Sequence, residues 1–495
     1  MSNVLSRDLI SSDFVLCQEN LNSKEITTIN RSQFIKMIDY WKILLVEKYQ
    51  ARPGQTVMLE FNLLNAYYYS AVFAVWELGM IMIVDWPHAF SYEDANGYRM
   101  TMHGKVDFAI LYSGQTDPNQ VFYSYWDYER NRLNCNTILT EKEFDSYQIQ
   151  DHSKFKEISQ KILATPDIDA VWTASGGTTG NPKQIKITHK EIALQAKRLV
   201  KHLNFNPGEN SLHTNNLHHG ASMCYHFLPS FIASENHYIY TGSRESNFYK
   251  NLSKYIIDRK INKVLLYSSE MLINFLSETS KLAHDLDIVT LFYVNKRCID
   301  LMHEKNVRSI RNVFGDTTIG YGFLVKVVDK NTDSDTYVTN RIGPKLDDFF
   351  DFKIKNGYLY VKVLGLGETE WKTSQDKFNL INNDYYFYGR GTQYRICDEW
   401  INLGDIDNKV AECFPEDGAT VVIDNEEQQL YLSVWKSNTQ GEQKFSQYLK
   451  DNYQHVKLNK VARDLNVIEY TVSRKVDRQK LMQYFRKIDN SNKVD

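Results

Sequence analysis

The sequence predicts an α/β protein with a large N-terminal body and a smaller α+β unit at the C-terminal end. Apolar segments of strand length alternate with helical patterns along most of the chain before residue 357. From about Gly357 the segments alternate between apolar and polar residues, which indicates a more antiparallel region. The segments 421–436 and 441–453 then add two short strands and a helix.

The strands and helices of the body follow one another in the order that is typical of parallel sheets. One long apolar stretch, 66–84, is interrupted by Glu77 and Gly79, so we expect a buried helix that ends near Leu78 and a short strand from Met80. The other predicted strands are 57–61, 107–112, 170–173, 263–267 and 289–294, and a clear helical pattern covers 190–203.

Composition and charge narrow the class of protein. The chain has 495 residues, with 58 Lys and Arg against 61 Asp and Glu, and the resulting net charge of −3 excludes a nucleic-acid binder that depends on bulk basicity. The hydrophobic share of 42% is typical of globular proteins, and the length suggests about three folding units. Six scattered cysteines and an N-terminus without an apolar leader predict a cytoplasmic protein with no membrane span.

The most informative segment is a loop rich in Gly, Ser and Thr that follows the predicted strand 170–173. It offers backbone N–H groups, hydroxyls and one lysine to a polyphosphate. The loop differs from the P-loop of common NTPases because Lys183 is followed by Gln184, where that motif has Ser or Thr. We therefore expect a different kind of phosphate chemistry.

The run 175–183, with the sequence SGGTTGNPK, resembles the phosphate loop of the adenylate-forming superfamily of AMP-binding enzymes. This superfamily contains acyl- and aryl-CoA ligases, non-ribosomal adenylation domains and firefly luciferase. The resemblance implies that ATP phosphates are held by Ser175, Gly177, Thr178, Thr179, Gly180 and Lys183.

Further motifs of the superfamily follow in the expected order. The element Phe314, Gly315, Asp316, Thr317 and Thr318 resembles the aromatic-Gly-x-Thr-Glu motif, whose aromatic residue lies against adenine and whose threonine contacts phosphate.

Two more positions resemble residues that hold the ribose, namely Asp376 and Arg390. A carboxylate accepts hydrogen bonds from two vicinal hydroxyls, and an arginine donates from a rigid fork. The segment 401–407 resembles the opening of the family's small C-terminal domain. In the run 473–478, Lys475 resembles the catalytic lysine, a cation that would stabilise the charge when a carboxylate approaches the α-phosphate.

The acid pocket is predicted from the segment 215–223, which resembles the His-His-Gly element of luciferase and CoA ligases. We expect the pocket to involve His218, His219, Gly220, Ser222 and Gly320, with His219 near the carboxylate and Tyr225 and Phe227 as further wall residues. His218 is equally well explained as a core or loop residue, and His219 less well; aromatic residues are so abundant in this chain that most of them are expected in the core. No aspartate is present here to pair with an α-ammonium group, which favours an aryl or acyl acid over an α-amino acid.

Three positions depart from the family pattern. Thr318 replaces the glutamate that helps to bind magnesium, so the Mg²⁺ ligand stays unassigned. Thr392 stands where the family has an Asp or Lys hinge, and Asp398 stands near the glycine that lines the pantetheine tunnel. A carboxylate at residue 398 would hinder a thiol carrier, so acid adenylation is the better supported half of the reaction.

The resemblance also implies the domain plan. We expect a large adenylation domain over residues 1–392, with α/β sub-domains, parallel-rich sheets and a distorted β-barrel. Residues 393–495 would form a small, mobile α+β domain that carries Lys475.

The leading hypothesis is an ATP- and Mg²⁺-dependent ligase that converts a small carboxylic acid into an acyl-adenylate and then transfers the acyl group to CoA. One alternative is transfer to the phosphopantetheine of an acyl carrier protein, or to an amine or hydroxyl. Another is a degenerate family member that binds nucleotide without turnover, motivated by Thr318 and Asp398. The identity of the acid, the final acceptor and the oligomeric state are left open.

Overall fold

The structure is a computed structural model of the chain. It describes residues 3–19, 25–60, 65–84, 92–93, 99–100, 106–111, 135–148, 152–174, 184–215, 217, 220–234, 236–240, 247–267, 269–291, 294, 296–319, 321–338, 341–390, 393–396, 399–414, 419–424, 429–434, 438–453, 456, 458–462 and 481–485. The chain contains two compact units. The first comprises Met1–Tyr337, Leu346–Phe349 and Val363–Glu368, and the second comprises Val338–Lys345, Phe350–Lys362 and Thr369–Asp495. The predicted domain boundary at residue 392 and the mobility of the smaller domain stay predictions.

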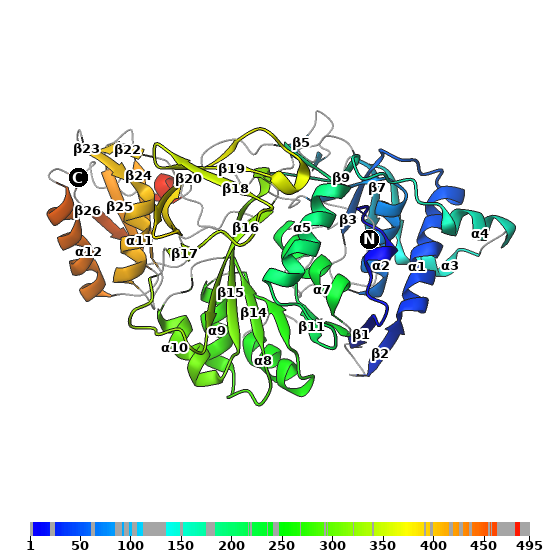
Figure 1. The fold of residues 1–495 in the computed structure, drawn as a ribbon, viewed down its shortest axis with the longest axis horizontal. Coiled ribbons are helices and arrows are strands. Elements are labelled where there is room, and N and C mark those ends of the chain that lie inside the picture. Colours follow the sequence, from blue (N-terminus) through cyan, green and yellow to red (C-terminus); the bar gives the residue numbers. More distant parts are fainter. Residues whose placement is uncertain are drawn as a thin grey trace. The chain divides into compact units, whose positions relative to one another are not determined.

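The larger sheet of the first unit has eight strands in the order β16-β15-β14-β13-β11-β12-β1-β2 (Figure 1). Six neighbouring strands run parallel, and β16 and β2 close the two edges in antiparallel pairing. The strands are β1 (Val15–Glu19), β2 (Ile26–Asn30), β11 (Asn210–His213), β12 (Asn236–Ile239), β13 (Lys263–Leu265), β14 (Asp287–Thr290), β15 (Ser309–Asp316) and β16 (Tyr321–Asp329).

The second sheet of this unit has six strands in the order β10-β9-β4-β3-β7-β8, and only β10 is antiparallel to its neighbour. Its strands are β3 (Thr56–Glu60), β4 (Ile81–Val84), β7 (Val106–Leu111), β8 (Cys135–Thr140), β9 (Asp169–Ala174) and β10 (Gln184–Thr188). A separate two-stranded ribbon pairs β5 (Tyr92–Glu93) with β6 (Arg99–Met100). The parallel-rich α/β architecture predicted from the alternating pattern is confirmed.

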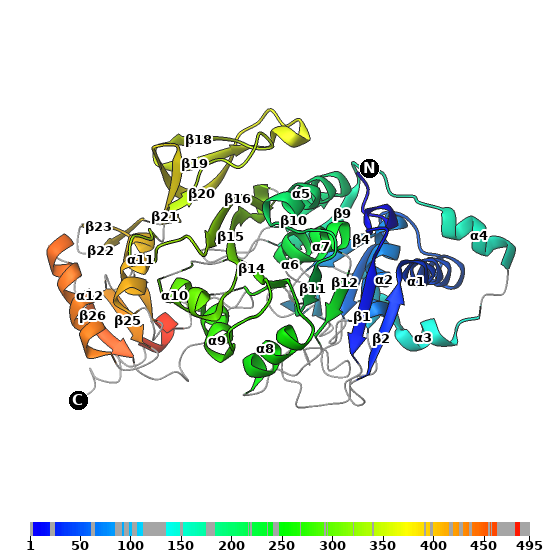
Figure 2. The same cartoon turned by 60° about the horizontal axis from the view of Figure 1, so that its bottom comes forward.

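Helices cover both faces of the larger sheet, because consecutive strand residues point to opposite sides. Val264 and Ile288 face the layer of α8, α9 and α10, whereas Leu265 and Val289 face the core that contains α5 and α7 (Figure 2). The helices of this unit are α1 (Arg31–Ile43), α2 (Ala66–Glu77), α3 (Glu141–Ser146), α4 (His152–Gln160), α5 (His189–His202), α6 (Gly220–Ser222), α7 (Leu228–Ala233), α8 (Phe248–Asp258), α9 (Ser269–Glu278) and α10 (Lys296–Lys305).

Short helical turns complete the first unit. Two of them, η2 (Leu44–Lys48) and η3 (Met223–Phe227), are π-helical, and the latter continues directly from α6 into α7. The 3₁₀ turns are η1 (Arg7–Leu9), η4 (Thr317–Ile319) and η5 (Leu364–Leu366).

The apolar stretch 66–84 folds as a helix, a turn and a strand, as its sequence predicts. Asn65 caps α2 by accepting from the N–H of Tyr68 at 2.9 Å, and Gly79 ends the helix with a φ of +69°, a conformation that glycine adopts without strain. Inside the first unit, α2 packs against α1. No helix in the part of the chain that the structure describes is long and apolar enough to cross a membrane.

Glu77, the charge that interrupts this stretch, is fully buried at the end of α2. Its Oε2 accepts from Lys42 Nζ at 2.8 Å and from Arg7 Nη2 at 2.6 Å, and Arg7 also contacts Asp39 at 2.6 Å. Two cations and two carboxylates thus balance one another. Because a buried charge is costly without a partner, this group explains why α2 tolerates a carboxylate.

The second unit contains an open antiparallel sheet in the order β17-β21-β20-β19-β18. Its strands are β17 (Arg341–Gly343), β18 (Asp351–Lys355), β19 (Tyr358–Lys362), β20 (Lys372–Ile381) and β21 (Asp384–Arg390). The antiparallel character predicted beyond Gly357 is confirmed. The expected distorted β-barrel is replaced by this open sheet, since the strands described here do not close on themselves.

The C-terminal part of this unit is the predicted α+β arrangement. The hairpin β22 (Gln393–Ile396) and β23 (Glu399–Asn402) precedes α11 (Leu403–Cys413). A three-stranded sheet follows, with α12 packed on α11, and the helical residues 481–485 place Leu481 and Phe485 against Val422 and Tyr431. The remaining elements are β24 (Ala419–Asp424), β25 (Gln429–Val434), α12 (Thr439–Asn452) and β26 (Leu458–Ala462).

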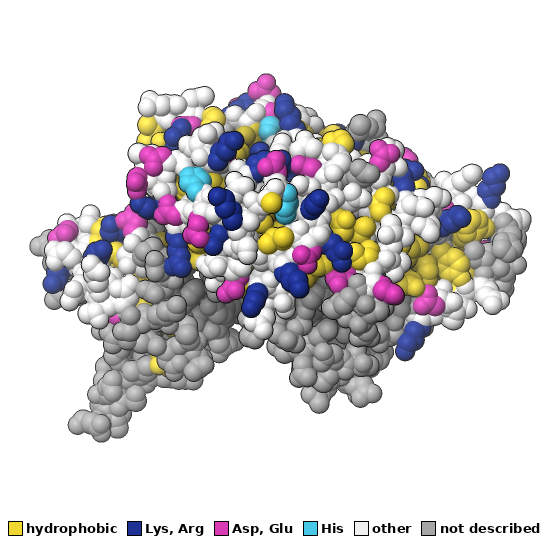
Figure 3. Space-filling view, turned by 90° about the horizontal axis from the view of Figure 1, so that it is seen from below, with side chains coloured by type: hydrophobic (Ala, Val, Ile, Leu, Met, Phe, Trp, Pro, Cys, Tyr) yellow, Lys and Arg dark blue, Asp and Glu magenta, His cyan; other side chains and the backbone are white. Residues whose placement is uncertain are grey.

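Surface charges are mixed on the face that Figure 3 presents, where Lys and Arg side chains lie interspersed with Asp and Glu. This distribution agrees with the balanced composition of the chain.

Candidate functional site

The predicted site residues divide into those that the structure describes and those that it does not. Twelve positions named above lie outside the described residues: Ser175, Gly177, Thr178, Thr179, Gly180, Lys183, His218, His219, Gly320, Thr392, Asp398 and Lys475. For Thr318 and Arg390 the backbone is described but the side chain is not. The roles of all of these residues stay predictions.

The strands that bracket the predicted phosphate loop are hydrogen-bonded partners. Ala174, the last residue of β9, is directly opposite Gln184, the first residue of β10. Both ends of the segment 175–183 are therefore held at one edge of the six-stranded sheet. Thr173 Oγ1 also donates to the carbonyl oxygen of Val84 at 2.8 Å, which ties β9 to β4.

Helix α5 begins directly after β10, and the side chains of Thr188 and Glu191 cap its first turn. Thr188 accepts from the N–H of Glu191, and Glu191 in turn accepts from the N–H of Thr188, at 3.3 and 2.6 Å. This reciprocal capping box satisfies N–H groups that the first turn of a helix leaves without partners. The strand β10, and with it one end of the loop, is thereby fixed to α5.

The second predicted nucleotide element lies at the end of β15. Phe314, Gly315 and Asp316 are its last residues, and Thr317 opens the turn η4. The pairing of β15 with β16 shifts register between Phe314 and Gly315, so the hairpin bulges at this motif. The ring of Phe314 meets Phe323 edge-on with 5.7 Å between ring centroids.

Arg198 connects α5 to this hairpin. Its Nη1 donates to the carbonyl oxygen of Gly322 in β16 at 3.0 Å, and its Nε donates to Asp347 Oδ2 at 2.6 Å. His202, one turn later on α5, lies 2.6 Å from the same carboxylate oxygen. Burial by itself would raise the pKa of Asp347, but the hydrogen bonds from His202 and Arg198 hold it well below its usual range. Asp347 is therefore ionised at neutral pH, and it fixes the side chain that links the two elements.

The predicted acid element is partly described. Gly220 and Ser222 form α6, and the helical run continues through η3, where Tyr225 and Phe227 are buried. Tyr225 reaches the β15–β16 hairpin: a Cβ atom placed on Gly315 would lie 2.6 Å from the Tyr225 hydroxyl oxygen. Residues that resemble an acid pocket and residues that resemble a nucleotide site thus meet at this tyrosine.

Three buried histidines near this helical run could not be predicted from the sequence. His213 Nε2 lies 3.2 Å from His237 Nδ1, and the ring of His226 meets that of His213 with centroids 4.9 Å apart. Burial lowers the pKa of His226 and of His237 to about 3, and it also lowers the pKa of His213. All three are neutral at physiological pH and pack as part of the core. His213, His226 and His237 are 11 to 24 positions apart and form no motif, so the sequence does not indicate that they lie together.

In the second unit, Asp376 and Arg390 are direct partners across β20 and β21. Asp376 is only 1% exposed. The two residues are therefore neighbours in the sheet, and their role at the ribose stays a prediction.

Among the described residues, no group of three or more His, Cys, Asp or Glu side chains is arranged to hold a metal ion. Asp316 is a half-buried carboxylate directly before Thr317. One carboxylate with phosphate oxygens and waters is a common set of ligands for Mg²⁺, so this position fits the ion.

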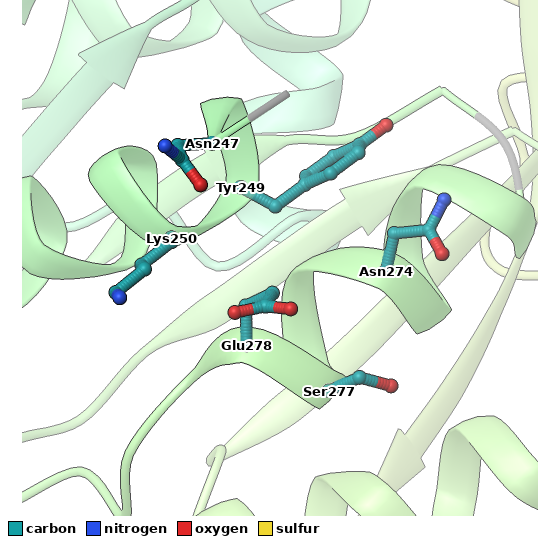
Figure 4. Close-up of a pocket in the computed structure, with 6 residues that line it drawn as sticks. All are labelled: Asn247, Tyr249, Lys250, Asn274, Ser277 and Glu278. Atoms are coloured by element: carbon teal, nitrogen blue, oxygen red, sulfur yellow. The ribbon is translucent and has the colours of Figure 1, made fainter. Parts of the chain in front are cut away.

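A pocket of about 290 Å³ lies between α8 and α9, lined by Asn247, Tyr249, Lys250, Asn274, Ser277 and Glu278 (Figure 4). Its lining is mainly polar, and none of these six residues belongs to the predicted site. We assign it no role.

Comparison with known proteins adds a family match and a set of similar folds. The family model described as AMP-binding enzyme matches residues 48–349, more than half of the chain. No curated protein sequence matches the chain.

Three solved structures illustrate the similarity in fold. The o-succinylbenzoate coenzyme A synthetase of Bacillus subtilis, in complex with AMP, has a TM-score of 0.70 at 15% identity, with 96% of each chain covered. The anthranilate CoA ligase AuaEII, in complex with anthranoyl-AMP, has a TM-score of 0.70 at 13% identity, covering 99% of this chain and 97% of the other. McyG A-PCP with phenylalanyl-adenylate has a TM-score of 0.69 at 14% identity, covering 98% and 82%. The Bacillus enzyme is also solved with ATP and a magnesium ion.

Proposed function

The chain belongs to the AMP-binding enzyme family, and on that premise we propose that it activates a carboxylic acid with ATP and then transfers the acyl group to CoA. In the first step a carboxylate oxygen forms a bond to the α-phosphorus of ATP, and the bond to pyrophosphate breaks. The products are an acyl-adenylate and pyrophosphate. In the second step a thiol attacks the acyl carbon and AMP leaves.

One observation carries this proposal. Helix α5 follows directly on the strand that closes the predicted phosphate loop, and its Arg198 holds the hairpin that presents Phe314 and Thr317. The two elements that resemble a nucleotide site are thus joined by one helix within one unit. Both elements also lie inside the range of the family match.

The residues then take the roles that the resemblance implies. Ser175, Gly177, Thr178, Thr179, Gly180 and Lys183 bind the phosphates, Phe314 with Gly315 supports the adenine, and Asp376 with Arg390 binds the ribose. Thr317 contacts the phosphate, and His219 lies near the carboxylate of the acid.

Lys475 supplies the cation that offsets the repulsion between the acid and the phosphate. Asp316 is a described carboxylate that would hold Mg²⁺ together with phosphate oxygens and water, and the ion would neutralise charge on the phosphates.

The acyl acceptor is the open part of the proposal. Transfer to CoA is supported by two structural neighbours that are CoA ligases, one of them also solved with a CoA product analogue. Transfer to a carrier protein is the alternative, because McyG is solved with a PCP domain and because Asp398 stands near the expected pantetheine path. A cytoplasmic setting is part of the proposal, because the six cysteines are scattered singly along the sequence.

Pyrophosphate exchange into ATP tests the first half-reaction. We expect exchange that depends on a supplied acid, measured across aryl, fatty and hydroxy acids, and a loss of about 10²–10³-fold in Lys475→Ala. Lys480→Ala is the matched control because it removes a cation from the same segment, and it should keep its activity. Exchange that Lys475→Ala leaves unchanged would remove this lysine from the mechanism.

The acceptor is then decided by measuring CoA consumption against release of free acyl-AMP. Consumption of CoA in step with AMP formation supports the ligase. Acyl-AMP release without CoA consumption favours a carrier protein or another acceptor. Tight ATP binding with no exchange across the whole acid panel would indicate a binding protein without turnover.

A further inference from the structure

One face of the antiparallel sheet in the second unit carries lysines next to aromatic rings. Residues directly opposite each other in an antiparallel pair project to the same face of the sheet. In the pair of β18 and β19, Lys353 is opposite Tyr360, and Lys355 is opposite Tyr358 (Figure 2). Both lysines are exposed, whereas Leu359, which lies between the two tyrosines, is fully buried. The lysines therefore lie on the face of the sheet that is open to solvent.

Two more lysines belong to this face. Lys362 lies two positions after Tyr360 in β19, so its side chain projects to the same side. Lys377, in β20, is opposite Tyr358, and its Nζ lies 5.8 Å from the centroid of the tyrosine ring. We call this surface the lysine face, and its cations are Lys353, Lys355, Lys362 and Lys377.

The ring of Trp371 brings two of these ammonium groups together. Lys353 Nζ lies 4.0 Å from the centroid of this ring and 5.6 Å from that of Tyr360. Lys362 Nζ lies 4.8 Å from the centroid of the same Trp371 ring. An ammonium group over an aromatic ring is attracted by the negative face of the ring. The ring thus holds two like charges near each other, although like charges repel.

Few carboxylates balance the charge of the lysine face. Strands β18, β19 and β20 contain two carboxylates, Asp351 and Asp376, and Asp376 is buried. Asp351 lies 3.8 Å from Lys362. For the other three lysines of the face, no carboxylate among the described residues lies within ion-pair distance. The face is therefore strongly positive, although the whole chain carries a net charge of −3.

We propose that the lysine face is a docking surface for an acidic segment of another protein. A partner of opposite charge relieves the repulsion between the ammonium groups and is attracted from a distance. A protein fits this face better than a single-stranded nucleic acid, because bases need aromatic rings that are open for stacking. Here the ring of Trp371 already holds two ammonium groups of the face itself. The docking surface is a function beyond the proposed adenylation and does not depend on it.

The geometry of the sheet also sets the spacing of the charges on the partner. Neighbouring strands lie about 4.8 Å apart, and alternate residues of one strand lie about 6.6 Å apart. Carboxylates at positions i and i+4 of a helix, or at positions i and i+2 of a strand, repeat at about these distances. We therefore expect the partner to carry its acidic residues along one face of a helix or a strand.

Fluorescence anisotropy with the full chain and labelled probes tests the inference. The main probe is a helical peptide of about 15 residues with glutamates at positions i, i+4 and i+7. A second peptide has glutamine at these positions, and an oligo(dT) of about 12 nucleotides represents nucleic acid. We expect only the glutamate peptide to bind at about 0.1 M NaCl, and its binding to disappear at about 1 M, where charges are screened within about 3 Å.

Three variants locate the binding surface. Lys353→Glu with Lys362→Glu should weaken the glutamate peptide by about fivefold or more, and the same pair changed to glutamine serves if the charge reversal prevents folding. Lys254→Glu with Lys281→Glu is the matched control, because it changes two exposed lysines of the first unit and the net charge equally. Its affinity should stay within about twofold of the wild type. Trp371→Leu keeps every charge but removes the ring, so it should weaken the peptide by about threefold.

Four results would overturn the inference. They are no binding of the glutamate peptide at about 0.1 M NaCl, an equal loss in the two double glutamate variants, tighter binding of oligo(dT) than of the peptide, and an unchanged affinity in Trp371→Leu. None of these measurements uses ATP or a carboxylic acid substrate. A failure here therefore leaves the proposed adenylation as it stands, and a failure of pyrophosphate exchange leaves the docking surface as it stands.

Discussion

The charge group around Glu77 gives a prediction that the structure quantifies. In Glu77→Gln the carboxylate that accepts from both Lys42 and Arg7 is replaced by a neutral amide of similar shape. Arg7 keeps Asp39, but the fully buried Lys42 is left with the carbonyl oxygen of Ser159 at 2.9 Å. Removing one partner of a buried ion pair costs about 3–5 kcal/mol, so we expect a loss of that size in the free energy of unfolding.

Urea denaturation followed by tryptophan fluorescence measures this loss, since Trp41 and Trp76 are fully buried in the same core. Glu304→Gln is the control because its carboxylate side chain is 63% exposed, and it should change stability by less than about 0.5 kcal/mol. The double variant Lys42→Met with Glu77→Leu removes both charges, and it should recover most of the loss. A loss below about 1 kcal/mol in Glu77→Gln, or a double variant as unstable as the single one, would refute the reasoning.

The same substitution predicts a pH dependence. Burial by itself would raise the pKa of Glu77, but the hydrogen bonds and charges of Arg7 and Lys42 outweigh it and lower the pKa. A carboxylate with a lowered pKa in the folded state stabilises the protein above its unfolded pKa, and this contribution disappears as the pH falls through the folded value. The difference between wild type and Glu77→Gln should therefore shrink as the pH falls from 7 towards 3. A constant difference across this range would contradict the assignment.

Two more predictions concern other buried contacts. Asp287→Asn removes the carboxylate that accepts from the fully buried Lys263 at 2.6 Å, so urea denaturation should show a loss of about 3–5 kcal/mol; a loss below about 1 kcal/mol would contradict the role of this pair. By helix propensity alone, Gly441→Ala would stabilise α12. The new Cβ atom would lie 2.7 Å from the carbonyl oxygen of Cys413, however, so we expect the free energy of unfolding to fall by about 1–3 kcal/mol. Hydrogen exchange of the amides in α12 measures this change. The exposed Gln443→Ala is the control in the same helix, and equal effects of the two substitutions would refute the clash.

Features set by nearby residues could be predicted from the sequence. The helix predicted to end near Leu78 and the strand predicted from Met80 are α2 and β4 in the structure, because a left-handed glycine and a change of periodicity are local signals. The predicted helix 190–203 differs from α5 by one residue at each end, as frayed helix ends usually do. The predicted strand 289–294 begins at Asp287 instead, because that charged residue is paired inside the sheet with Lys263.

Contacts between distant segments could not be predicted in this way. The approach of Tyr225 to Gly315, the link from Arg198 to Gly322 and the gathering of the buried histidines each depend on side-chain directions that the tertiary packing decides. Spacing along the chain carries no information on these directions. The motifs that predict the site are short and close together in the sequence, whereas the residues that position them belong to other elements.

The partners of Glu77 also bear on how the chain is made. Synthesis proceeds from the N-terminus, so Arg7 and Lys42 have left the ribosome before the apolar helix α2. Glu77, the carboxylate of this helix, can therefore pair with both cations as soon as it emerges. The carbonyl group of Ser159 and the N–H of Leu163, which complete the contacts of Lys42 and of the Glu77 backbone, arrive later. A nascent chain that stops before residue 159 therefore carries a buried ammonium group with an incomplete set of acceptors. Shortened versions of this protein should extend beyond residue 164, so that Lys42 and the backbone carbonyl group of Glu77 keep these contacts.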